Sequence, residues 1–173
     1  MNNYLQNIAS FILQYNTYFD RGFSNAYQSA NGVQDGATVL MPNDALGDYF
    51  YLRPSPALSI TTNEQGRVTD CAVPAALNAQ VNLIAVVRNA DSVLLANNLI
   101  TTLSQYQLPI GSVIMQSEEV IQQELGRMDR EQIDATLQRL QPNTKIIAIA
   151  FTARISLPFI KIDCLPNPCS ACG

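Results

Sequence analysis

The chain has 173 residues, a formal net charge of −4 and only 14% charged residues, and it contains no histidine. The missing histidine removes the commonest general base and metal ligand, which excludes most Ser-His-Asp, Cys-His and zinc-hydrolase schemes. The ten basic residues are scattered singly, so no basic stripe is present that would neutralise several phosphates at once. We therefore expect a protein that is not an enzyme, has no cofactor and does not bind nucleic acid directly.

The amino-terminal residues predict a helix over residues 3–17, because apolar side chains recur at spacings of three and four from Tyr4 to Tyr15. Amide side chains interrupt this apolar pattern and no positively charged segment precedes it, so we expect no signal peptide. No stretch approaches 18 apolar residues, and we expect no transmembrane helix either.

Residues 20–36 are rich in Asn, Ser, Gln and Gly and show little periodicity, which predicts a long loop. We expect this loop to be mobile in the isolated chain, because it buries too little apolar area to offset the entropy of ordering. Aromatic residues are concentrated before and within it, and such residues often anchor interfaces. Four of them are expected to contact a neighbouring subunit: Tyr18, Phe19, Phe23 and Tyr27.

The next segment predicts short strands at residues 37–41, 49–53 and 58–62, separated by proline-containing turns and followed by a hairpin turn. Asp44 and Asp48 lie in one of these turns, where two carboxylates could hold a divalent ion or form an acid pair. Aspartate is also a default turn residue, and we favour that interpretation.

Two long alternations of apolar with small or polar residues, at residues 77–88 and 144–157, predict the main strands. In the second alternation, one face is expected to be core, while the other is small and semi-polar. Strands of this length exceed the usual five or six residues, which favours assembly with neighbouring subunits over chemistry.

Helical patterns lie between the two alternations. Asp91 or Ser92 is expected to cap a helix that ends near Tyr106, and a strand is expected at residues 112–116. Helical spacing then continues over residues 117–141, where the acidic residues fit a solvated helix start: Glu118, Glu119 and Glu124. The order predicts one α+β domain over residues 1–160, with a mainly antiparallel sheet and helices packed on one of its faces.

Residues 161–173 contain Cys164, Cys169 and Cys172 at a C-x4-C-x2-C spacing, which matches the first three ligands of plant-type two-iron ferredoxins. A fourth ligand is lacking nearby, since Cys71 lies far upstream and no histidine can substitute for it. We favour an extended, proline-containing C-terminal arm that binds no metal. A metal- or redox-binding module that uses these cysteines is the alternative function.

The predicted elements follow a definite order along the chain: a leading helix, a β-rich middle with a hairpin, a strand at residues 79–87, a following helix and a closing strand at residues 146–155. This order resembles that of bacteriophage tail-terminator proteins. The resemblance implies a structural subunit that forms a homo-oligomeric ring in the phage neck or tail, as a tail terminator or a head-tail connector. It also implies contacts with portal, connector or tail proteins, and a location in the virion after synthesis in the host cytoplasm. DNA is expected to pass through such a ring without specific binding.

Overall fold

The computed structural model describes residues 2–24, 28–29, 32–33, 47–62, 72–108, 110–115, 117–126, 130–140 and 143–161. Its helices are α1 (Asn2–Tyr15), α2 (Ser92–Gln105), α3 (Ser117–Leu125) and α4 (Arg130–Arg139). Its strands are β1 (Arg21–Phe23), β2 (Gln28–Ser29), β3 (Gly32–Val33), β4 (Tyr49–Thr62), β5 (Ala72–Arg88), β6 (Ile110–Met115) and β7 (Thr144–Lys161). Five strands form one sheet in the order β1-β4-β5-β7-β6, and β2 pairs with β3 separately.

The main sheet is mainly antiparallel, which confirms the predicted α+β class. The pairs β4–β5, β5–β7 and β6–β7 are antiparallel, and only the short pair β1–β4 is parallel. The two long alternations form its two longest strands, and both strands run further than predicted, over 17 and 18 residues. Their register is continuous from Ala75 opposite Leu157 to Arg88 opposite Thr144.

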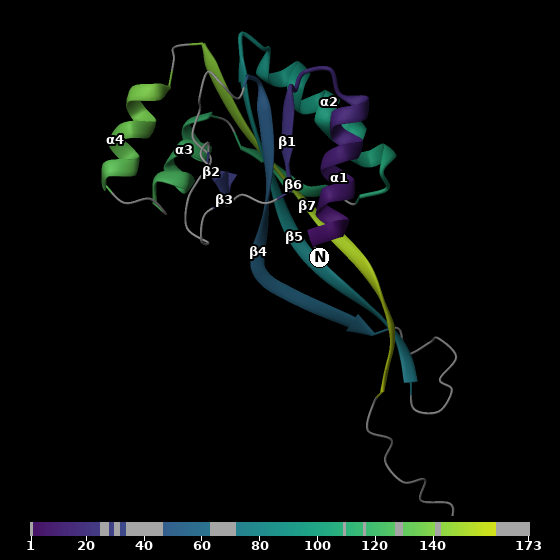
Figure 1. Ribbon diagram of the computed structural model, residues 1–173. Helices are drawn as coiled ribbons and strands as arrows, with labels where there is room; N and C mark the ends of the chain where they lie inside the picture. The colour runs from purple at the N-terminus through teal and green to yellow at the C-terminus, as the bar shows by residue number, and fades with distance from the viewer. Residues whose placement is uncertain are drawn as a thin grey trace, which may run out of the picture.

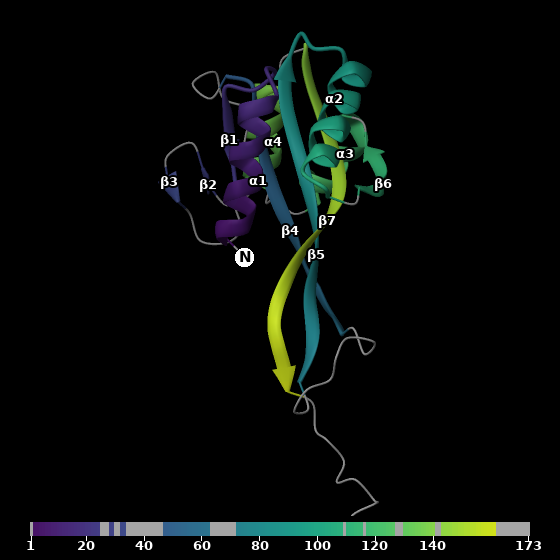
Figure 2. The ribbon, with the colours of Figure 1, turned by 90° about the vertical axis from the view of Figure 1, so that its right-hand side faces the viewer.

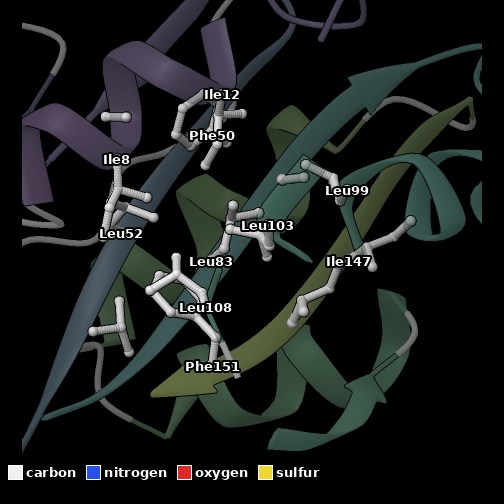
Figure 3. Packing of buried hydrophobic residues seen from close by; sticks show 14 of the residues in the cluster. Ile8, Ile12, Phe50, Leu52, Leu83, Leu99, Leu103, Leu108, Ile147 and Phe151 are labelled. Atoms are coloured by element: carbon white, nitrogen blue, oxygen red, sulfur yellow. The ribbon is translucent and has the colours of Figure 1, made fainter. Parts of the chain in front are cut away.

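Helices cover both faces of the sheet, whereas the sequence predicted helices on one face only. The first face carries the larger core, in which α1 and α2 pack on the sheet (Figures 1 and 3). On the second face lies α3 (Figure 1), whose Val120 belongs to a second cluster with Tyr49, Tyr51 and Ile84. The alternation misled this prediction because small residues such as Ala148 suit either solvent or a closely packed helix, and Ala148 is buried on the second face.

Figure 3 shows how the first face is filled. Successive inward positions of each strand lie two residues apart, while those of each helix lie three or four apart, as the two periodicities require. The fully buried side chains include Ile8 and Ile12 of α1, Leu99 and Leu103 of α2, and Phe50, Leu52, Leu83, Ile149 and Phe151 of the sheet.

Side-chain caps and a buried amide fix the helices of the first face. The Asp91 carboxylate accepts hydrogen bonds from the backbone N–H groups of Val93 (2.8 Å) and Leu94 (3.1 Å), which confirms the predicted cap of α2. The buried Asn16 donates from Nδ2 to Oδ1 of Asn98 (3.1 Å), and so joins the end of α1 to the middle of α2. Its own Oδ1 accepts a bond from the Tyr18 backbone.

Prolines do not end the strands where the sequence predicted a break. β4 runs through Pro54 and Pro56, and the register with β5 shifts between Pro54 and Leu58. β5 likewise contains Pro74, and its register with β7 shifts between Val73 and Ala75. Because proline lacks the backbone N–H that a strand ladder needs, each strand accommodates its proline at a register shift and then continues.

The predicted loop over residues 20–36 contains regular structure in its described part. Arg21–Phe23 forms β1, which pairs in parallel with Tyr49–Tyr51 of β4. The pairing places these three residues beside a strand that begins 28 positions later, a contact that local composition does not encode. The predicted strand at residues 37–41 and the hairpin turn at residues 63–66 lie outside the described residues.

Candidate assembly surface

Strands β4, β5 and β7 continue past the helices as a twisted three-stranded ribbon (Figures 1 and 2). We define the extension as residues 58–62 of β4, 75–79 of β5 and 153–157 of β7, which face one another in five successive levels. Each level crosses all three strands. Most of the extension lies beyond the helices (Figures 1 and 2), so among the described residues parts of its faces and both of its edges are open to contacts outside the chain.

One face of the extension is apolar. Ile60, Leu77 and Ile155 form one level across the three strands and therefore point to the same side. Ile60 is 59% exposed, while Leu77 and Ile155 are partly buried. At the end nearest the body, Ala79 and Ala153 on this side are fully buried, and Ala153 belongs to the larger core cluster. The apolar row thus continues the first face of the sheet beyond the point where helices cover it.

The opposite face of the extension is polar and carries few charges. One of its two levels consists of Ser59, Asn78 and Arg154, of which Ser59 and Arg154 are exposed. Asn78 donates from Nδ2 to the Thr61 hydroxyl (3.0 Å), so hydroxyls and amides satisfy one another across the strands. No carboxylate occurs at any of the fifteen positions of the extension. Such a face has no acid with which to hold a cation.

Both edges of the extension are open within the described part of the chain. β1 pairs with β4 only as far as Tyr51, and β6 pairs with β7 only from Ala148 to Phe151. In the described sheet, no strand flanks the outer sides of residues 58–62 and 153–157. Unpaired edges present backbone donors and acceptors in a row, and they pair readily with another strand.

Asp48 has a structural task that explains its position in the turn. Its carboxylate accepts a hydrogen bond from the Arg88 backbone N–H (3.0 Å), its carbonyl oxygen accepts one from the Asp20 N–H (2.7 Å), and its own N–H donates to the Asp20 carboxylate (2.9 Å). These bonds join the starts of β1 and β4 to the end of β5. Asp44, the other member of the predicted acid pair, lies outside the described residues.

Three of the four aromatic residues predicted at a subunit interface pack against the chain's own core. Phe19 is buried and stacks edge-to-face on Phe50, with ring centroids 5.0 Å apart. Phe23 and Tyr18 are partly buried against the two core clusters, and Phe23 lies 6.2 Å from the Tyr49 ring. Phe19 is therefore not available to a partner, because its surface is already covered. Tyr27 lies outside the described residues.

The described residues contain no cluster of three or more side chains that could hold a metal ion. The weak metal candidates Cys164, Cys169 and Cys172 lie outside the described part of the chain, as does Cys71. Glu118 and Glu119 are exposed in the first turn of α3, where the helix dipole stabilises them as predicted.

Two tyrosine hydroxyls in the described part of the chain have a raised pKa. Burial raises the pKa of Tyr49 well above its usual value of about 10, although the positive charge of Arg88 opposes that rise. Burial also raises the pKa of Tyr4, and the neighbouring Tyr106 raises it further. In both cases the shift favours the protonated form of the hydroxyl.

Comparison with protein families, curated proteins and solved structures finds no match to this chain. The two longest described helices have 14 residues each, and none of the described helices has the length and hydrophobicity needed to cross a membrane. The extension is therefore the feature from which we infer a function. In the sequence it is indicated by the length of the alternating segments, which form strands longer than the helices packed on them.

Proposed function

We propose that this chain is a structural subunit that assembles with copies of itself into a ring. The observation that carries the proposal is the extension, whose exposed apolar row and two open edges lie beyond the helices. A sheet that continues past its own helices costs conformational entropy and leaves apolar surface in water. Contact with a second copy offsets these costs, because it pairs an open edge and buries part of the row.

The apolar row alone contributes a useful part of the contact energy. Fully burying one isoleucine side chain stabilises by about 1.5–3 kcal/mol, and Ile60 is 59% exposed. Covering it therefore adds about 1–2 kcal/mol at each junction, which is close to a tenfold gain in affinity. A ring repeats this gain at every subunit boundary.

We place this ring in the neck or tail of a bacteriophage particle, as a tail terminator or a head-tail connection. The order of elements that resembles tail-terminator proteins supports this placement, together with the α+β fold and its long closing strand. Neighbouring portal, connector or tail proteins would then be its partners, and DNA would pass through the opening without specific binding.

Electron microscopy of the purified full-length chain tests the proposal. We expect uniform closed rings with a central opening, together with a solution mass that is an integer multiple of 19.0 kDa. Mixing the rings with purified tail tubes or portal complexes of the same particle should produce stacked assemblies. A chain that stays monomeric alone and in these mixtures would contradict the proposal.

A further inference from the structure

We propose that neighbouring copies join edge to edge through the extension, with residues 58–62 of one copy beside residues 153–157 of the next. The partner at each edge is thus a second copy of this chain, and the junction extends the sheet from subunit to subunit. This inference rests on the proposed ring and specifies which surfaces close it.

The first argument is that the two edges lie at the same level. Ile60 is opposite Leu77, and Leu77 is opposite Ile155, so the outer strands of the extension are aligned across the central one. The same alignment holds at all five levels. A neighbour can therefore place its residues 58–62 beside residues 153–157 with the levels in register. Repeated head-to-tail contacts of this kind form a ring when the rotation between copies returns to the first copy.

The second argument is that the faces stay matched across the junction. At the aligned register, Ile60 of one copy lies beside Ile155 of the next, which makes the apolar row continuous between subunits. Ser59 lies in the same way beside Arg154 on the polar face. A slip of one residue would bring isoleucine beside arginine, so the alternation specifies the register. β4 and β7 both run antiparallel to β5, so the new strand pair is parallel.

The third argument is that prolines limit the pairing to this stretch. Pro54 and Pro56 precede residues 58–62 along β4, and Pro158 directly follows residues 153–157 along β7. Prolines at an edge discourage pairing because they lack a backbone donor. The five residues between these limits contain no proline on either edge, and Arg154 is their only charged residue. Prolines thus bound the aligned stretch, with Pro56 at its end on β4 and Pro158 at its opposite end on β7.

A disulfide test distinguishes this junction from any contact within one chain. In a single copy, Ile60 and Ile155 are separated by the whole of β5, which places them about 9–10 Å apart at the usual strand spacing. A disulfide needs Cα atoms within about 7 Å. The double variant Ile60→Cys/Ile155→Cys can therefore form this bond only between copies whose unlike edges meet.

The experiment introduces the pair into the full-length chain with all four native cysteines replaced by serine, followed by mild oxidation and denaturing electrophoresis. We expect a ladder of covalent multimers that ends at the mass of the native ring. Each single variant should remain monomeric on the gel, because like edges do not meet. In the matched control Ile60→Cys/Lys145→Cys, the second cysteine lies about 33 Å further along β7 on the same face, and we expect no ladder.

The possible results of this experiment distinguish failure of the edge-to-edge junction from failure of the proposed ring. A native chain that forms rings but gives no ladder in the double variant would overturn the edge-to-edge junction and leave the ring proposal intact. Dimers of a single variant would overturn it as well, because they would show that like edges meet. A native chain that never oligomerises would overturn both. If the serine background does not fold, the pair is placed in the native chain and its disulfide is identified by mass spectrometry of linked peptides.

Discussion

Replacing Asp48 by alanine should destabilise the fold, because its side chain is a hydrogen-bond acceptor at the place where three strands meet. The carboxylate accepts the Arg88 backbone N–H at 3.0 Å, near the point where β5 ends and the chain turns toward α2. Alanine removes this acceptor. The backbone bonds between Asp48 and Asp20 do not depend on the side chain at position 48, so they are kept.

The expected magnitude follows from the kind of bond that is lost. A hydrogen bond to a charged group contributes about 1.5–3 kcal/mol, and the partly buried position of Asp48 lowers this to about 1–2 kcal/mol because water can replace the acceptor in part. For a domain of this size, that loss lowers the thermal midpoint by about 2–8 °C. Urea unfolding should show the same loss in the free energy of unfolding, with an unchanged slope.

The matched variant Asp48→Asn separates hydrogen bonding from charge. Asparagine keeps an acceptor oxygen at the same reach, so we expect it to recover most of the midpoint that alanine loses. Circular dichroism at neutral pH measures both variants against the parent. An alanine variant as stable as the parent, or an asparagine variant no better than alanine, would refute the structural role of this side chain.

Three further predictions concern other parts of the chain. Gly47→Ala should lower the thermal midpoint by removing about 1–3 kcal/mol of stability, since Gly47 has φ +67° and an added methyl would collide with the Asp20 carboxylate; an unchanged midpoint would contradict this. The raised pKa of Tyr49 means that the folded state keeps a proton which the unfolded state releases above about pH 10. Its contribution to stability is therefore complete below pH 10 and is lost as the pH rises further, and Tyr49→Phe should flatten that part of a curve of midpoint against pH. Truncation after Lys161, where β7 ends, should leave the midpoint unchanged, and the full chain should contain no stoichiometric zinc or iron; failure to fold, or a bound metal, would instead favour the metal-binding alternative.

Local signals allowed much of the fold to be predicted. Asp91 before a helical pattern marked the start of α2, and the observed cap bonds to Val93 and Leu94 are those that such a residue makes. The period of two along β5 and β7 likewise identified the main strands and the side of each residue. These features depend on neighbours within a few positions, which a sequence displays directly.

Contacts between distant residues could not be read in the same way. The parallel pairing of β1 with β4 and the position of α3 on the second face both depend on which surfaces meet in space. Pro56 suggested a break in β4, but in the described sheet no strand lies on the outer side of β4 beyond Tyr51, so Pro56 interrupts no ladder on that side. Phe19 looked suited to an interface because aromatic residues serve cores and interfaces alike, and only its burial decides between them.

Along β7 the alternation of side chains between the two faces stays the same, whereas the burial of its second face changes. Its second face begins buried, at Ile146 and Ala148 beneath α3, and ends exposed at Arg154 and Ser156 in the extension. One strand thus serves first as core and then as surface, although its period never changes. The semi-polar face that the sequence predicted is therefore correct for the extension and wrong for the body.

The central claim is that copies of this chain meet through the extension, and sedimentation of one variant pair tests it most directly. Ile60→Ser removes the exposed apolar side chain of the extension, while Val93→Ser removes one of similar exposure, 64% against 59%, at the start of α2. We expect the parent and the Val93 variant to sediment as the same closed oligomer, and the Ile60 variant to dissociate at roughly tenfold higher concentration. Equal sedimentation of all three chains as oligomers, or a parent that is a monomer, would contradict the account.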